Sequence, residues 1–348
     1  MLQLFGGLFL LVIGAELSVR AAVRLAASLK VRPLIIGLTV VAMSSSAPQM
    51  AVSLQAAFSS SPDISVGSVV GSNIFNVLVT LGLCALIIPL RVARQLVRVD
   101  IPLMIGASAL VFALAYNGEL SAIDGAILLF ALLAYLLVLA RRSQGQVPKN
   151  PPGQPHASRA QQFISLMTMV FGLALLVMGA GLLVQAAAVI AQDLGLSERV
   201  IGLTVIAGST SLPALTTSLI AAMRGERDIA VGNVIGSNLF NLLGVLGLTA
   251  MVAPSPLSIS PNALNFDLPV MLAVSAVCLP VFYSGYRVTR TEGLLLLSLY
   301  LAYGLHIVSF TTGMPLANTL EKLMSYGVLP LLAALILFTT VRAWRRQH

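Results

Sequence analysis

Long apolar runs separated by short polar stretches make up most of this chain. Eleven runs approach or exceed the roughly 20 residues that an α-helix needs to cross the hydrocarbon core of a bilayer. The pattern therefore predicts an all-α membrane protein. The predicted segments cover about 4–27, 34–58, 64–90, 100–117, 121–140, 162–191, 199–223, 229–253, 267–284, 291–310 and 323–342.

Two parts of this pattern are copies of each other. Residues 35–83 and 200–248 align without a gap at an offset of 165, and 27 of the 49 columns are identical. Shared apolar composition would not reproduce a string such as GSN-x-FN at one offset. Weaker matches extend on both sides, so residues 1–141 and 161–310 are predicted to be two five-helix repeats. The eleventh segment, within 311–348, is an addition that ends in a basic tail.

The composition of the chain indicates a membrane protein, and its charge distribution predicts the orientation in the membrane. The chain has 348 residues, is 58% hydrophobic and 9% charged, and has a mean hydropathy of +0.97, which excludes a soluble domain. With the N-terminus outside, 18 of the 20 basic residues lie on the cytoplasmic side, the exceptions being Arg199 and Lys322. The polar, Pro-rich linker 142–160 and the C-terminus are then cytoplasmic. This bias explains the net charge of +8 in a cell (inner) membrane protein, and no nucleic-acid partner is expected.

An odd number of helices in each repeat gives the two repeats opposite directions across the membrane. Within the second and seventh segments, the apolar pattern is interrupted by the runs Met43-Ser44-Ser45-Ser46-Ala47-Pro48-Gln49 and Gly208-Ser209-Thr210-Ser211-Leu212-Pro213-Ala214. Proline frees a backbone carbonyl, which a membrane protein tolerates only in its interior or at a cavity. We therefore expect kinked or unwound helices near 43–49 and 208–214, and oxygen ligands for a cation at the midplane. The alternative is that these small polar residues only stabilise close contacts between helices.

The paired motifs resemble the two alpha repeats of the sodium/calcium exchanger (cation/Ca2+ antiporter) superfamily. The strings that carry the resemblance are GLTVVAMSSSAPQ with GSNIFN and GLTVIAGSTSLPAL with GNVIGSNLFN. The resemblance implies a ten-helix fold of two inverted halves, and alternating access by sliding of the first and sixth helices. It also implies an ion site where the second, third, seventh and eighth helices meet. The implied site residues are Ser45, Ser46, Gln49, Ser72, Asn76, Thr210, Ser211, Ala214, Ser237 and Asn241, with the backbone carbonyls of Ala42 and Ala207.

The chain departs from the family pattern at two positions. The family motif usually reads G-T-S-x-P-E in each half, and these Glu side chains carry much of the Ca2+ binding. Here the positions are Gln49 and Ala214, and Asn76 and Asn241 are neutral as well. Neutral oxygens do not repay the hydration that a buried divalent cation loses. The side-chain chemistry therefore favours Na+ over Ca2+ as the transported cation, and no tight metal site is predicted.

Glu16 is a candidate accessory charge near the middle of the first segment. The simpler interpretation is an ion pair with Arg20 one helical turn away. No nucleophile–base set or phosphate-binding loop is present in the sequence, so neither enzyme activity nor a cofactor is expected. The expected partners are the lipid bilayer and small inorganic cations. The alternatives to a cation antiporter are the same fold with another substrate (a monovalent cation, a proton or a small polar solute) and a non-transporting membrane scaffold.

Overall fold

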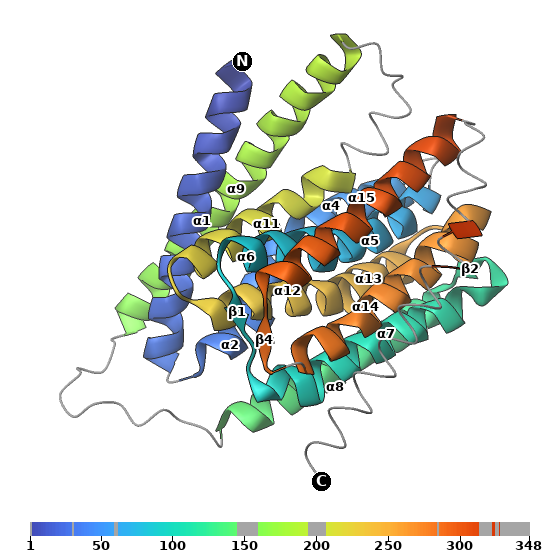
Figure 1. The fold of residues 1–348 in the computed structure, drawn as a ribbon. Coiled ribbons are helices and arrows are strands. Elements are labelled where there is room, and N and C mark those ends of the chain that lie inside the picture. The colour runs from blue at the N-terminus through green and yellow to red at the C-terminus, as the bar shows by residue number, and fades with distance from the viewer. Residues whose placement is uncertain are drawn as a thin grey trace.

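A computed structural model of the chain describes residues 2–29, 31–58, 62–144, 159–193, 207–283 and 285–312, together with 322, 323 and 327. This part of the chain is almost entirely helical (Figure 1). The elements of the first half are α1 (Leu2–Leu29), α2 (Pro33–Ile36), η1 (Gly37–Val41), α3 (Ala42–Ser45), α4 (Ala47–Ala57), α5 (Pro62–Phe75), η2 (Asn76–Leu81), α6 (Gly82–Ile87), β1 (Leu90–Arg91), η3 (Leu96–Asp100), α7 (Ile101–Leu114), η4 (Ala115–Asn117), β2 (Glu119–Leu120) and α8 (Ala122–Gln144).

The second half follows the same order of long helices and short connections. Its elements are α9 (Arg159–Asp193), α11 (Ala207–Met223), α12 (Arg227–Leu239), η6 (Phe240–Val245), α13 (Leu246–Val252), β3 (Leu257–Ser258), η7 (Ala263–Asp267), α14 (Leu268–Tyr283), β4 (Arg287–Val288) and α15 (Arg290–Thr312).

The first ten predicted segments are mainly helical where the structure describes them, with a turn at Ser46 and with Leu90, at the end of the third segment, in β1. Within the described residues, seven helices are long and apolar enough to cross a membrane, and there are eight spans if the bent pair Pro33–Ser45 and Ala47–Ala57 is taken as one. The fold class is therefore confirmed. The seventh segment is described only from Ala207 onward. The predicted linker 142–160 is shortened at both ends, because α8 continues to Gln144 and α9 begins at Arg159. Residues 145–158 and, apart from 323 and 327, the eleventh segment at 323–342 lie outside the described residues.

The helices that carry the GSN strings are at the centre of the bundle. The span Arg227–Val252 is buried along its whole apolar stretch, whereas only 22% of that of Ala122–Arg141 is buried. Figure 1 shows α5, α6 and α12 in the middle, with α1 and α9 on one side and α7 and α8 on the other. Lipid cannot satisfy polar side chains, so the polar helices are enclosed by apolar ones. This arrangement places Ser, Thr and Asn side chains in the interior.

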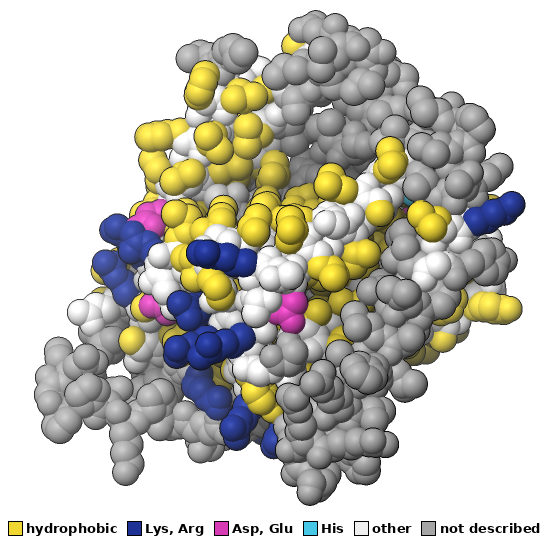
Figure 2. Space-filling model, in the orientation of Figure 1, with side chains coloured by type: hydrophobic (Ala, Val, Ile, Leu, Met, Phe, Trp, Pro, Cys, Tyr) yellow, Lys and Arg dark blue, Asp and Glu magenta, His cyan; other side chains and the backbone are white. Residues whose placement is uncertain are grey.

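Contacts between the halves are reciprocal. β1 pairs with β4, and β2 pairs with β3, so each short two-stranded sheet joins one half to the other. Lys and Arg side chains gather at the end of the molecule that carries the β1–β4 pair, beside a broad hydrophobic surface (Figure 2). There the register places Arg91 opposite Arg287. The pairings agree with loops that alternate sides as the sequence predicts.

Glycines form the seam between α1 and α9. A Cβ on Gly14 would lie 2.6 Å from the Gly172 carbonyl oxygen, and one on Gly7 would lie 2.8 Å from that of Gly179. The order of these contacts shows that the two helices are antiparallel. At each of these two contacts, backbone lies directly against backbone. Small residues allow this close approach between membrane helices.

The two predicted interruptions differ. The first copy bends by 40° between Ser45 and Ala47, as predicted. The second prediction is wrong in part, because α11 continues as a helix through Pro213. Leu212 stands where the first copy has Ala47, and it packs against the apolar cluster that joins α1 to α9. This packing stabilises the turn that contains the proline.

Two π-helical turns that the sequence pattern does not predict occur at equivalent places in the two halves. η2 begins at Asn76, and η6 includes Asn241 as its second residue. Each turn is wider than an α-helical turn and changes which side chains face the interior beyond it. Such turns often occur at functional sites.

Candidate ion-binding site

Most of the side chains assigned from the sequence meet in one buried polar cluster. They come from α3, α4 and α5 with η2 of the first half, and from α11 and α12 with η6 of the second half. Ala207 lies at the start of α11, in a stretch whose side chains are not described. The buried members are Ala42, Ser45, Ser46, Gln49, Ser72, Asn76, Thr210, Ser211, Ala214, Ser237 and Asn241.

Ser72 of α5 connects the two halves on one side of the cluster. Its hydroxyl donates to Gln49 Oε1 at 2.8 Å and accepts from Ser211 Oγ at 3.0 Å. It also lies 3.2 Å from Thr210 Oγ1. One hydroxyl thus ties α5 to α4 and to α11.

Ser45 of α3 makes the matching connection on the other side. Its hydroxyl lies 2.9 Å from Ser237 Oγ of α12. At the repeat offset of 165, this contact is the counterpart of the one between Thr210 and Ser72. The single proton of the Ser45 hydroxyl is shared between the Ala42 carbonyl oxygen at 3.1 Å and Asn233 Oδ1 at 2.9 Å. The two hydroxyl pairs show that the halves are related by an approximate two-fold axis.

Four asparagines surround this axis. Asn73 Nδ2 donates to the Asn238 carbonyl at 3.4 Å, and Asn238 Nδ2 donates to the Asn73 carbonyl at 3.3 Å. Asn76 Nδ2 donates to Asn238 Oδ1, and Asn241 Nδ2 donates to Asn73 Oδ1, each at 3.0 Å. Every contact in the group therefore has a reciprocal partner.

Three buried oxygens in the cluster have no hydrogen-bond partner among the residues that the structure describes: Ser46 Oγ, Asn76 Oδ1 and Asn241 Oδ1. Buried acceptors in native proteins are normally paired, and an unpaired one costs about 1–3 kcal/mol. The two asparagine oxygens are repeat equivalents, one from each half.

Sequence reasoning missed three asparagines of this network. Asn73 and Asn238 belong to the quoted GSN strings, but no role was assigned to them. Asn233 was not singled out, although its Oδ1 accepts from the site residue Ser45. A signal for it was present in the sequence, because the first repeat has Ser68 in the same column.

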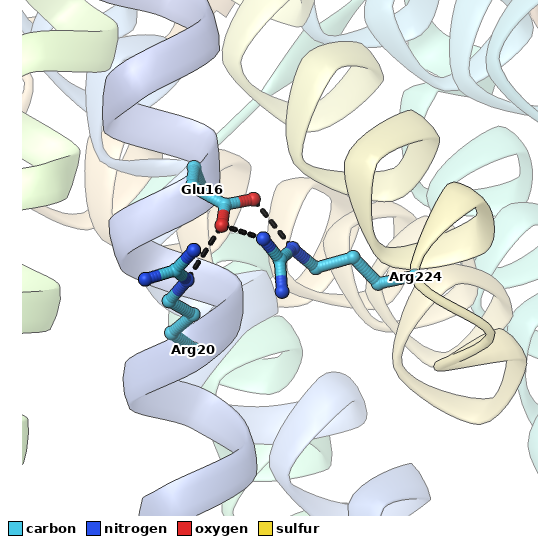
Figure 3. A network of polar contacts seen from close by, with 3 residues as sticks. All are labelled: Glu16, Arg20 and Arg224. Carbon is cyan, nitrogen blue, oxygen red and sulfur yellow. Dashed lines mark hydrogen bonds and ion pairs between the residues drawn. The ribbon is translucent and has the colours of Figure 1, made fainter.

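Glu16 of α1 takes part in an ion-pair group outside the cluster (Figure 3). Arg20 on the same helix pairs with it at 2.5 Å, as the simpler interpretation predicts. Arg224, at the end of α11, also binds the Glu16 carboxylate through two of its guanidinium nitrogens. The carboxylate is thus neutralised by two arginines. No group of three or more His, Cys, Asp or Glu side chains that could hold a metal occurs among the described residues.

Comparison with known proteins decides the family. The family model described as "Sodium/calcium exchanger protein" matches residues 1–141 and 164–309. The chain belongs to the sodium/calcium exchanger family. It is 37% identical over 304 residues to the putative antiporter CaxA of Alkalimonas amylolytica, a match that covers 85% of this chain and 95% of CaxA. It is 39% identical over 277 residues to the inner membrane protein YrbG of Escherichia coli, covering 78% of this chain and 85% of YrbG.

The structural comparison agrees with this assignment to the exchanger family. The solved structure of the sodium-calcium exchanger NCX_Mj, soaked with 10 mM Na+ and zero Ca2+, aligns with a TM-score of 0.74 at 29% identity. The alignment covers 89% of this chain and 97% of NCX_Mj. The predicted family and exchanger fold are therefore confirmed, and the chain is a multi-pass membrane protein of a transporter family.

Proposed function

We propose that this exchanger-family member is a secondary-active cation antiporter that works by alternating access, and that its midplane site binds a monovalent cation, Na+. The observation that carries the proposal is the buried cluster of hydroxyl and amide groups, which contains three unpartnered oxygens. Its side chains come from both halves, so a bound ion would be held by both.

The choice of Na+ rests on the absence of a carboxylate among the side chains assigned to the site. Gln49 and Ala214 stand at the family's two Glu positions, and Asn76 and Asn241 are neutral. Moving an unpaired ion from water into a medium of low dielectric costs on the order of tens of kcal/mol, and more for a divalent ion than for a monovalent one. Neutral dipoles offset this cost more readily for Na+. The charge of Glu16 is already balanced by Arg20 and Arg224.

The α1–α9 seam supports alternating access. These helices correspond to the first and sixth helices, which slide in the related family. Glycines of one helix lie against glycines of the other at two places, so the two backbones are in direct contact there. A smooth seam of this kind lets two packed helices shift along each other.

Ion flux into proteoliposomes tests the function. We expect exchange of radiolabelled Na+ that is accelerated by Na+ on the opposite side, without Na+-driven Ca2+ uptake. Ser72→Ala removes the hydroxyl that joins α5 to α4 and α11, and should lower Na+ exchange about tenfold, which corresponds to about 1.4 kcal/mol, the size of one such hydrogen bond. Ser108→Ala is the matched control, because Ser108 is buried and bonded to Ser275 Oγ at 3.0 Å outside the cluster.

Two results would overturn this proposal. Ca2+ uptake driven by an Na+ gradient would contradict the ion assignment. Vesicles that exchange none of Na+, K+, H+ and Ca2+ would favour a scaffold.

The proposed orientation is tested by labelling single cysteines in the membrane. Both native cysteines are buried and give a low background. A membrane-impermeant maleimide added to intact spheroplasts should label Asn117→Cys, in the exposed loop before α8, but not Gln154→Cys in the linker. Permeabilised cells should show labelling of both. Labelling of Gln154→Cys in intact spheroplasts would show that the orientation in the membrane is the opposite of the proposed one.

A further inference from the structure

The two halves hold a side-chain carboxamide in the same local setting, but each takes it from a different helix. In the first half the group belongs to Gln49 of α4. Its Nε2 donates to Ser53 Oγ at 3.2 Å and to Ser68 Oγ at 2.9 Å. Its Oε1 accepts from Ser72 Oγ at 2.8 Å. All four side chains are buried.

In the second half the carboxamide belongs to Asn233 of α12. Its Nδ2 donates to Ser218 Oγ at 2.9 Å and to the Ala214 carbonyl at 3.2 Å. Its Oδ1 accepts from Ser237 Oγ at 3.4 Å and from Ser45 Oγ at 2.9 Å. Both the donors and the acceptor of this buried amide are therefore satisfied.

The partners of the two amides are equivalent. At the repeat offset of 165, Ser218 corresponds to Ser53, and Ser237 corresponds to Ser72. In each half the amide nitrogen donates to the serine five residues after the proline, which is Ser53 or Ser218. The amide oxygen accepts from the serine of the GSN string, which is Ser72 or Ser237. The carboxamide thus occupies one place relative to the two-fold axis, although it is attached at different positions in the chain.

The exchange of helices is visible in two columns of the repeat. The first half combines Gln49 with the small Ser68, and the second combines the small Ala214 with Asn233. Each half therefore has one amide side chain and one small residue facing each other. Close-packed interiors accept a change of size at one position when a neighbour compensates for it.

We propose that Asn233 is the specificity-determining residue of the second half, supplying to the cation the side-chain oxygen that Ala214 lacks. The inference rests on the proposed function, because it concerns the same midplane site. Gln49 Oε1 of the first half and Asn233 Oδ1 of the second then join the unpartnered oxygens of Asn76 and Asn241 around the cation. The serine hydroxyls that now donate to these oxygens rotate away when the ion binds, since a hydroxyl is both donor and acceptor.

The decisive experiment compares carboxylates at the two positions in a common Gln49→Glu background. Asn233→Asp changes charge without changing volume, whereas Glu at position 214 must share space with Asn233. Calorimetric titration with CaCl2 should show that Gln49→Glu/Asn233→Asp binds Ca2+ at least as tightly as Gln49→Glu/Ala214→Glu. Both should bind about a hundredfold more tightly than Gln49→Glu alone. Gln49→Glu/Asn117→Asp is the control, because it adds the same charge in an exposed loop.

The outcomes separate this inference from the proposed function. Strong Ca2+ binding by the Ala214→Glu double variant, with none by the Asn233→Asp double variant, would overturn the role of Asn233 and leave the site in place. Absence of Ca2+ binding in both would overturn the midplane site and this inference with it. Equal gains in the Asn117→Asp control would also contradict the inference.

A swap of residues tests the same point without adding charge. Ala214→Gln and Asn233→Ser should each weaken Na+ binding. The first places a second amide side chain beside Asn233, and the second removes the amide oxygen that would bind the ion. The double variant copies the arrangement of the first half and should restore Na+ affinity to within about threefold of the unmodified protein. NaCl titration of all four proteins, with thermal unfolding in detergent alongside, separates ion binding from stability. A double variant weaker than both single variants would overturn the proposal.

Discussion

Replacing Gln49 and Ala214 together by Glu is expected to produce a protein that binds Ca2+ at least about a hundredfold more tightly than the unmodified chain. Each substitution introduces a formal negative charge and two acceptor oxygens at a position now occupied by an amide or a methyl group. A contact with a charged partner contributes roughly 1.5–3 kcal/mol, and every 1.4 kcal/mol is a factor of ten in affinity. Two such contacts account for the expected gain.

The same double variant should show a clear pH dependence. Without a cation, two buried carboxylates repel each other and take up protons, so Ca2+ must displace these protons when it binds. Ca2+ affinity should therefore rise with pH. Calorimetric titration at pH 6 and pH 8 measures this effect, and Gln49→Met with Ala214→Leu provides a control of similar volume without charge. Micromolar Ca2+ binding by the unmodified protein would contradict the site assignment, and Glu16→Gln would then show whether that carboxylate is responsible.

A valine at Gly14 is expected to stop transport. Its side chain would meet the Gly172 carbonyl oxygen and the Leu176 backbone nitrogen, which lie 2.6 and 2.8 Å from the position of a Cβ. Backbone atoms cannot turn aside as a flexible side chain does, so α1 must move away from α9. Overpacking of this kind typically costs 1–3 kcal/mol. We expect a lower unfolding temperature in detergent and at least about tenfold slower Na+ exchange, with Na+ affinity almost unchanged.

Gly6→Val is the matched control, because Gly6 lies on the same helix and a Cβ there meets nothing within 4 Å. The intrinsic cost of valine in a helix is the same in both variants and cancels in the comparison. Equal effects of the two substitutions would show that the α1–α9 seam has no special role. A loss of Na+ affinity in Gly14→Val would show that the seam supports the ion site rather than the movement.

The helices and their arrangement could be predicted because the signals are local or repeated. The length of the apolar runs gave the spans, and the offset of 165 gave the two halves. The effect of each proline on its helix was harder to predict. Pro48 follows a bend, whereas Pro213 lies within a continuous helix, and the difference depends on what Leu212 contacts on α1 and α9. The residues of the motif alone do not reveal a contact with a distant segment.

The site was predicted at the level of residue types and helices, but its connections were not. The reciprocal bonds of Asn73 and Asn238 depend on how the two copies cross, which the sequence of one copy does not contain. The π-helical turn that begins at Asn76 likewise has no sequence signature. Asn233 is different, because comparing columns that differ between the copies would have pointed to it.

The exchange of the amide between helices also bears on how the two halves have diverged since they were duplicated. Gln49 and Ser68 lie in one half, and Ala214 and Asn233 lie in the other, so each compensating pair is complete within its own repeat. The asparagines at the axis, in contrast, bond across the halves and are identical in both copies. Two positions that compensate for each other in size within one repeat can change together in that repeat alone. A change at one asparagine of the axis would leave a buried amide of the other half without its partner, so these positions are constrained in both copies together.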